Sequence, residues 1–266
     1  MAANAVLWTV DPRGVAEVTL NRPDRNNAYD GSLLDGLHTA LDALETERGL
    51  RAVVIRGAGR HFQAGADLDW LTSVRDGGVI ANEAASRRTA EAVERLDQTP
   101  VPTIARVQGA CIGGGTGLLA ATDVVIAEET ATFAISEVRW GLTAAIIVPH
   151  LVRAIGSRQA RRYALTAERF TASEAQRIGL VHEIVAPGGL DLACASRVSD
   201  ILKNAPGAIA ETKAQIRSAA ASEDDADMLN TFIAEHSAKR QSEEAGEGLA
   251  SFKEKRPAHW QPADDA

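Results

Sequence analysis

The chain has 266 residues, and 45% of them are hydrophobic, which is enough to bury a sizeable core in one or two domains. Lys and Arg number 28 against 36 Asp and Glu, so the net charge is −8. This balance argues against nucleic acid or an anionic membrane as the main partner, because either needs a concentrated basic face. Aromatic residues are only 4% while glycines number 22, so the core must be built from small and aliphatic side chains on closely spaced backbones.

The two cysteines give no metal or disulfide framework. Cys111 and Cys194 lie far apart without Cys-x-x-Cys spacing, which excludes the common structural zinc motifs and gives no sign of a disulfide scaffold. The N-terminus lacks the cationic start and apolar run of a secretory signal. No window approaches the ~20 continuous apolar residues that span a bilayer. We therefore expect a soluble, cytoplasmic protein.

The first third of the chain is predicted to form two strands, a helix and a third strand. Val6–Val10 and Val15–Leu20 are rich in β-branched residues, and the turn-forming segment Asp11–Gly14 between them predicts a hairpin. Leucines spaced three to four residues apart predict an amphipathic helix over 30–47. The apolar run at 52–56 predicts a buried strand.

The middle of the chain repeats this pattern. A helix is predicted over 82–96, a strand over 103–107, a helix of small residues over 116–121, and strands over 124–127 and 131–135. The recurring order of strand, strand and helix predicts a mixed α/β domain with layered, coil-like connectivity.

The last third is mainly helical by its pattern. Thr171–Glu174 has capping-box spacing and predicts a helix that ends near Gly179, before a strand at 182–185. Spaced apolar residues then predict helices over most of the last seventy residues, and the polar tail 257–266 is expected to fray. We expect a core domain over residues 1–195 and a smaller helical domain over 196–266.

Two glycine-rich segments fail the tests for familiar motifs. Residues 57–68 follow a predicted strand, but the third glycine of a dinucleotide fingerprint falls at Phe62. Residues 109–117 lack the Gly-Lys-Ser/Thr of a P-loop, and the chain has no Gly-x-Ser-x-Gly elbow. His182-Glu183 is not followed by the second histidine of a zinc helix. No metal site is predicted.

A different use of glycine remains, in which two loops aim one backbone N–H each at the same oxygen. Such an oxyanion hole stabilises charge that develops on a carbonyl, typically by ~3 kcal/mol per donor. The small residues 64–66 allow close approach to a ligand, and residues 113–115 open a predicted helix. Tight turns with close strand–helix packing are the alternative, and glycine content alone favours that reading.

A resemblance carried by several motifs decides between these readings. Three motifs follow one another: Phe62 to Leu68, Gln108 to Gly115, and Ser136 to Leu142. Leu20–Pro23 with Asn27-Ala28, and Leu165–Phe170 running to Gly179–Val181, support them. Together they resemble the crotonase, or enoyl-CoA hydratase/isomerase, superfamily over essentially the whole chain. Residues 65–70, 136–142 and 160–166 are most similar to bacterial 3-methylglutaconyl-CoA hydratases.

This resemblance implies an α/β fold, a spiral of repeated strand-strand-helix turns with a C-terminal helical domain. It implies an acyl-CoA thioester whose carbonyl accepts hydrogen bonds from the backbone N–H groups of Ala66 and Gly114, and whose enolate is the shared intermediate. Two-carboxylate hydratases carry one glutamate at the position of Glu137 and another at that of Gly117, which here has no side chain. No cofactor is implied beyond the CoA of the substrate.

With one carboxylate, three possibilities stay open. Glu137 handles both proton transfers; another group replaces the missing partner; or the reaction is isomerisation or decarboxylation. Hydration is the leading expectation, because sequences like the methylglutaconyl-CoA hydratases also tend to lack the first glutamate. The setting would be branched-chain or fatty acyl-CoA breakdown. A non-catalytic acyl-CoA-binding protein is the alternative from another class.

Further positions are carried over from the same motifs. Arg139 would hold the distal carboxylate of a glutaconyl group, or else pair locally at the surface or an interface; a dienoyl-CoA isomerase branch tends to carry aspartate there. Asp67 is expected to cap a turn beside the CoA crevice. Phe252 and Lys255 resemble a C-terminal segment that reaches a neighbouring subunit's CoA site, in a homotrimer or a dimer of trimers. The remaining residues expected to contact CoA or the acyl group are Arg25, Ala28, Ala64, Gly65, Leu68, Trp70 and Gly113.

Overall fold

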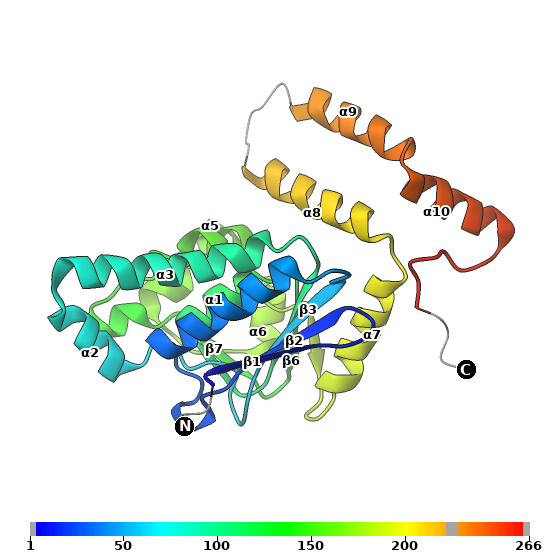
Figure 1. Ribbon diagram of the computed structural model, residues 1–266. Coiled ribbons are helices and arrows are strands. Elements are labelled where there is room, and N and C mark those ends of the chain that lie inside the picture. The colour runs from blue at the N-terminus through cyan, green and yellow to red at the C-terminus, as the bar shows by residue number, and fades with distance from the viewer. Residues whose placement is uncertain (1–3, 222–227, 263–266) are drawn as a thin grey trace.

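The computed structural model describes residues 4–221 and 228–262. Its centre is a six-stranded sheet in the order β1-β2-β3-β4-β6-β9, in which β1 and β2 are antiparallel and the later neighbours are parallel (Figure 1). The strands are β1 (Val6–Val10), β2 (Val15–Leu20), β3 (Ala52–Gly57), β4 (Thr103–Val107), β6 (Val124–Glu128) and β9 (Glu183–Val185).

The predicted hairpin of β1 and β2 is confirmed, and its turn closes as the residue types require. The Asp11 carboxylate accepts hydrogen bonds from the backbone amides of Arg13 at 2.8 Å and Val15 at 3.0 Å. Gly14 follows with φ +79°, a left-handed conformation that glycine adopts without strain.

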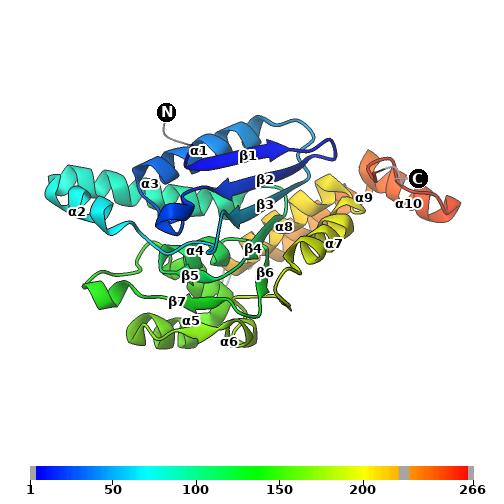
Figure 2. The same cartoon turned by 90° about the horizontal axis from the view of Figure 1, so that it is seen from below.

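A second sheet of three short strands stands beside the first, in the order β5-β7-β8 (Figure 2). The chain alternates between the two sheets, since β4 and β6 belong to the large one while β5 and β7 belong to the small one. This alternation makes the expected spiral of turns. The strands are β5 (Ala110–Ile112), β7 (Thr132–Ala134) and β8 (Phe170–Thr171). β5 and β8 were not predicted, because two or three residues are too few to show a period.

Helices cover both faces of the large sheet, and α1 begins where its Asp30 cap accepts a hydrogen bond from the amide of Leu33 at 2.9 Å. In β3, Val53 and Ile55 join the main core with α1 and α3, while Ala52 and Val54 pack toward α7 on the opposite face. The helices around the sheets are α1 (Gly31–Thr46), α2 (Leu68–Asp76), α3 (Gly78–Gln98), α4 (Gly114–Ala120), α5 (Val148–Thr166), α6 (Ala172–Arg177) and α7 (Leu190–Leu202).

Two predicted helix boundaries differ from the structure. The helix predicted over 82–96 begins earlier, at Gly78, and α2 precedes it. None of the α2 residues is buried, so α2 shows no strong apolar face in the sequence. The helix predicted from Thr116 begins at Gly114, because glycines conceal a helix start from propensity arguments.

Three more helices, α8 (Pro206–Ala221), α9 (Met228–Arg240) and α10 (Glu243–Glu254), project from this body as an arm (Figure 1). The expected boundary at residue 195 falls inside α7, whose Val198 and Leu202 are buried against the sheet. Arg51 ties the junction together, with Nη1 donating to the Trp260 carbonyl at 2.7 Å and Nη2 to the Leu202 carbonyl at 3.1 Å.

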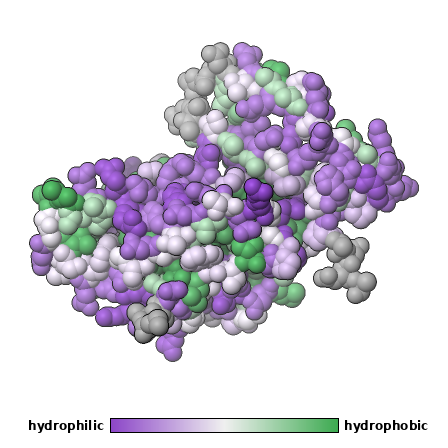
Figure 3. Space-filling model, viewed as in Figure 1, coloured by the Kyte–Doolittle hydropathy of each residue, from purple (hydrophilic) through white to green (hydrophobic). Residues whose placement is uncertain are grey.

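The surface of the arm mixes hydrophilic and apolar side chains (Figure 3). Phe252 is 84% exposed, and large apolar residues on all three helices of the arm are also exposed: Ile216, Leu229, Ile233 and Leu249. Among the described residues, no helix combines the length and apolar character needed to cross a membrane.

Candidate active site

A cavity of about 850 Å³ opens between α1, α2, α3, the start of α4 and the segment that follows β7. Both glycine-rich segments contribute to its wall, including Ala64, Gly65, Ala66, Gly113 and Gly114. The sequence motifs that lie far apart along the chain therefore meet at one cavity.

Backbone hydrogen bonds hold the two segments together. The Gln63 amide donates to the Ala110 carbonyl at 3.2 Å, and the Ile112 amide donates to the Gln63 carbonyl at 2.9 Å. A Cβ on Gly113 would lie 3.7 Å from the Cα of Gly65. Both glycines have positive φ, +55° for Gly113 and +88° for Gly65, so glycine is needed at this crossing.

The amides of Ala66 and Gly114 have the properties that an oxyanion hole requires. No group of the described residues accepts a hydrogen bond from either amide, whereas their neighbours are bonded. The Asp67 amide donates to the Tyr29 carbonyl at 2.8 Å, and the Gly113 amide donates to the Ala134 carbonyl at 2.8 Å. Two donors without partners at one cavity wall can bind a carbonyl oxygen.

Glu137 lies beside these amides, at the start of a short 3-10 helix, η2 (Glu137–Trp140). Its Oε1 would be 3.1 Å from a Cβ on Gly113, and its buried Oε2 has no hydrogen-bond partner in the described chain. Burial raises the pKa of the Glu137 carboxyl, partly offset by the backbone amides of Glu137 and Ser136. A carboxyl in this environment can both accept and return a proton.

The position of the second glutamate is closed by packing. Gly117 lies in α4, where a Cβ would meet Cγ2 of Ile147 at 2.1 Å and its Cβ at 2.7 Å. Ile147 is 3% exposed and lines the cavity. The isoleucine thus takes the space into which a side chain at position 117 would extend.

Sequence reasoning missed Tyr29 as a residue of the site. Its Cε1 would lie 2.8 Å from a Cβ on Gly114, so the ring covers the glycine that presents the second amide. The Tyr29 ring packs edge-on against Trp70, with centroids 5.6 Å apart. Its place directly after Asn27-Ala28 was the available signal, but that motif says nothing about where the next side chain points.

The part of the cavity away from the amides is mainly apolar. Its wall is formed by α1, α2, α3 and α4, whose contributing residues include Leu33, Leu34, Leu37, Trp70, Leu71, Val74, Ala92, Val93 and Leu118. An apolar wall of this kind suits a hydrocarbon chain.

Other expected contact residues divide into two groups. Leu68 lines the cavity, but Arg25 and Ala28 do not. Arg25 is exposed and forms an ion pair with Asp69 at 3.5 Å. Asp67 caps α2, since its carboxylate accepts hydrogen bonds from the amide of Asp69 at 3.0 Å and more weakly from that of Trp70. The capping role predicted for Asp67 is confirmed.

Arg139 also lines the cavity. One of its nitrogens donates to the Ala167 carbonyl at 2.8 Å, and no carboxylate of the described residues pairs with the guanidinium. Arg169 lines the same wall and is equally without an ion pair there. Phe252 and Lys255, by contrast, lie at the end of α10, exposed and outside the lining of the cavity.

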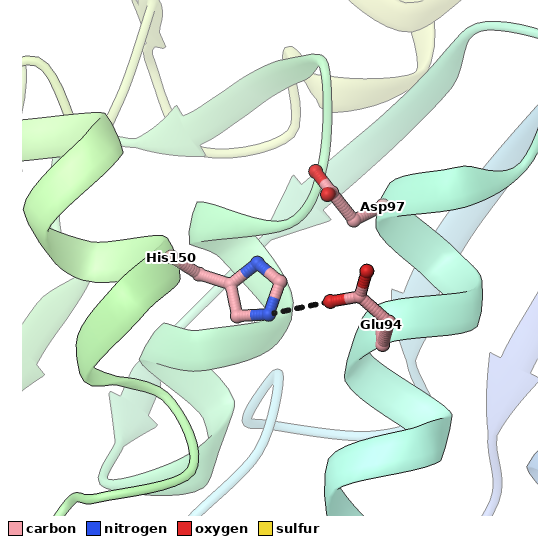
Figure 4. Close-up of side chains that lie close together, drawn as sticks. All are labelled: Glu94, Asp97 and His150. Carbon is pink, nitrogen blue, oxygen red and sulfur yellow. Dashed lines mark ion pairs between the residues drawn. The ribbon is translucent and has the colours of Figure 1, made fainter. Parts of the chain in front are cut away.

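A cluster outside this cavity has metal-binding residue types. Glu94 and Asp97 of α3 face His150 of α5, with 3.5 Å between Nε2 of His150 and a carboxylate oxygen of Glu94 (Figure 4). Arg153 fills the remaining side of the cluster, with Nη2 2.7 Å from Nδ1 of His150 and 3.3 Å from Asp97. Since the Arg153 guanidinium already pairs with His150 and Asp97, we interpret the cluster as a set of polar contacts that joins α3 to α5.

The chain is similar to known proteins over nearly its whole length. The model of the family described as enoyl-CoA hydratase/isomerase matches residues 11–263. A putative enoyl-CoA hydratase of Thermus thermophilus is 35% identical, over 94% of this chain and 99% of its own. A mevalonyl-coenzyme A hydratase of Aspergillus fumigatus is 32% identical, over 92% and 91%. The crystal structure of an enoyl-CoA hydratase from Shewanella pealeana superposes with a TM-score of 0.92 at 36% identity, covering 96% of each chain.

The fold and the site define an enzyme of the crotonase superfamily, with the α/β spiral and C-terminal helices that this class shares. The chain belongs to the enoyl-CoA hydratase/isomerase family.

The packing of Gly117 against Ile147 makes a testable prediction. We expect Gly117→Ala to lower the free energy of unfolding by about 1–3 kcal/mol, because the added methyl group overpacks the core. Combining it with Ile147→Ala should cost less than the sum of the two single changes, since the smaller side chain makes room. Urea titration measures both effects.

Gly246→Ala is the matched control, because Gly246 is also inside a helix but has no atom within 4 Å of the added Cβ. It should be neutral or stabilise the protein by up to about 1 kcal/mol. A Gly117→Ala variant as stable as the Gly246→Ala variant would show that Ile147 does not close this position.

Proposed function

We propose that the protein is an enoyl-CoA hydratase, which adds water across the 2,3-double bond of an enoyl-CoA. The observation that carries this proposal is the placement of Glu137: its Oε1 lies against Gly113, the residue before the Gly114 amide, and its buried Oε2 has no hydrogen-bond partner among the described residues. The amides of Ala66 and Gly114 at the same cavity wall are also without partners. A thioester carbonyl bound to the N–H groups of Ala66 and Gly114 would put its α and β carbons next to that carboxylate.

The chemistry follows from this placement. Attack of water on Cβ moves electron density onto the thioester oxygen, and the two amides stabilise that oxyanion, typically by ~3 kcal/mol each. Ionised Glu137 accepts a proton from the attacking water, and the enolate then takes a proton at Cα. The buried carboxyl suits this exchange because its raised pKa makes it a stronger base than a solvated glutamate.

The single carboxylate also supports a second candidate. Isomerisation or decarboxylation of an acyl-CoA requires one acid/base group, and Gly117 supplies no second carboxylate. A non-catalytic acyl-CoA-binding protein would keep the cavity and the amides without needing Glu137.

The acyl group we favour is of the 3-methylglutaconyl type, in branched-chain or fatty acyl-CoA breakdown. Arg139 supports this choice, because its guanidinium lines the cavity and pairs with no carboxylate of the described residues. A planar guanidinium binds a distal carboxylate with two parallel hydrogen bonds.

A homotrimer, or a pair of trimers, would account for the arm. Phe252 is exposed far out on α10, and the cavity of the same chain has no contact with it. In such an assembly Phe252 and Lys255 would reach the CoA site of a neighbouring subunit. CoA itself arrives as part of the substrate, and the proposed reaction needs no other cofactor.

Glu137→Gln should remove most turnover, by about 10²–10⁴-fold, because the amide cannot accept the proton of the attacking water. Binding of butyryl-CoA, which has no double bond to hydrate, should persist. Crotonyl-CoA, 3-methylglutaconyl-CoA and a 3-enoyl-CoA are supplied in turn, and loss of conjugated thioester absorbance and product mass are followed.

These substrates separate the candidate functions. Hydrated product from a 2-enoyl-CoA identifies the hydratase, a shifted double bond identifies the isomerase, and loss of carbon dioxide identifies the decarboxylase. Binding without any product favours the non-catalytic alternative. Near-wild-type turnover by the Glu137→Gln variant would remove Glu137 from the mechanism.

The pH dependence has a defined sign. In the hydration direction the active form has Glu137 ionised, so kcat/KM falls as the pH drops through the pKa of the free enzyme. Since burial raises the pKa of Glu137, the midpoint of this acid limb should lie above the ordinary glutamate value of about 4.3. An acid limb at or below that value would mean that the carboxyl is solvated.

Arg139→Ala tests the choice of acyl group. If the guanidinium binds a distal carboxylate, its loss should lower kcat/KM for glutaconyl thioesters by about 10-fold or more, consistent with a charge-assisted hydrogen bond. Crotonyl-CoA, which lacks that carboxylate, is the internal control. An unchanged ratio between the two substrates would assign Arg139 to the surface.

A further inference from the structure

Hydration transfers two protons, one from water and one to Cα, and Glu137 is the one carboxylate among the cavity-lining residues. The place of a second carboxylate is filled by Ile147, which would lie 2.1 Å from a Cβ at position 117. Where two groups divide the two transfers, the second proton carrier comes from another element of the cavity wall.

Tyr29 is placed for that role. Its ring lies against Gly114, while the Glu137 carboxylate lies against Gly113, so the two side chains flank consecutive residues of one loop. The backbone holds Tyr29 there, since its amide donates to the Gly65 carbonyl and its carbonyl accepts from the Asp67 amide, both at 2.8 Å. Tyr29 is thus bonded to residues on both sides of Ala66, the first oxyanion donor.

The hydroxyl of Tyr29 is available to a ligand. No group of the described residues forms a hydrogen bond with it. Two wall threonines differ in this respect, since the Thr72 and Thr89 hydroxyls donate to carbonyls of their own helices at 3.0 Å and 2.9 Å. A phenol is also a stronger acid than the aliphatic hydroxyls in the wall.

The protonation states of the two groups complement each other. Burial, with a smaller contribution from the charge of Glu137, raises the pKa of Tyr29 to about 12. Tyr29 therefore remains an O–H donor under conditions in which Glu137 is ionised, which is the division of roles that paired acid and base groups need.

We propose that Tyr29 is the second proton-transfer residue of this site, the group that protonates Cα while Glu137 deprotonates the attacking water. The proposal rests on the hydratase function proposed above. Water oxygen bonds to Cβ and its proton goes to Glu137; the phenolic proton goes to Cα as the enolate collapses. The proton on Glu137 then returns to the phenolate, so one water is added and both residues are restored.

Tyr29→Phe tests this role, because phenylalanine keeps the ring over Gly114 and its contact with Trp70 while removing the hydroxyl. We expect kcat for crotonyl-CoA to fall by about 10²-fold or more, with the dissociation constant of butyryl-CoA unchanged. Tyr163→Phe is the matched control. Tyr163 is the other tyrosine of the chain; it is buried, and its hydroxyl donates to Glu174 outside the cavity.

A double variant tests whether the two residues work together. If Tyr29 and Glu137 act in one proton relay, Tyr29→Phe with Glu137→Gln should be little slower than Glu137→Gln alone. Multiplying rate losses would instead show independent roles and overturn the relay.

The outcomes distinguish this inference from the function on which it rests. An active wild type with a Tyr29→Phe variant within threefold of it overturns the role of Tyr29 and leaves the hydratase function standing. A Tyr29→Phe variant that loses butyryl-CoA affinity as much as turnover also overturns the role, since the hydroxyl would then serve binding. A wild type that hydrates no enoyl-CoA overturns both.

Discussion

The site depends on the close approach of two backbone segments, one before α2 and one between β5 and α4. Two hydrogen bonds through Gln63 join them, and Gly65 and Gly113 meet there with positive φ angles that favour glycine. Because the segments are paired like neighbouring strands, the amides of Ala66 and Gly114 keep fixed directions without any side chain. Backbone amides held this way need no reorganisation as charge develops on a substrate oxygen.

The core is likewise built with few large side chains. Few aromatic rings are available, so β3 packs aliphatic residues on both faces, Val53 and Ile55 toward α1 and α3 and Val54 toward α7. Gly109, with φ +61°, allows the tight turn from β4 in the large sheet to β5 in the small one. Gly117 belongs to this packing as much as to the site, because Ile147 fits against its bare Cα. Adding a carboxylate at that position would require repacking of the cavity wall.

The elements with strong periodicity were predictable. The β1–β2 hairpin, α1 and the parallel strands β3, β4 and β6 occupy nearly the expected residues, because their apolar residues follow the period of one buried face or a continuous buried run. α2 was not predictable, because none of its residues is buried and its sequence shows no strong apolar face. The strands β5 and β8 were not predictable, because they are too short to show a period. Such short strands form because they pair with segments distant in the sequence, as β5 pairs with β7.

The sequence by itself determined the family motifs, the glycines at the two loops, Glu137 and the lack of a side chain at position 117. The tertiary structure decided that Ile147 fills that position, that Tyr29 covers Gly114, and that Phe252 lies away from the cavity of its own chain. The physical reason is that residue type and spacing specify local backbone and chemistry. The side chain that occupies a given space is decided by contacts between segments far apart in the sequence. Gly117 meets Ile147 in this way, and Gly114 meets Tyr29.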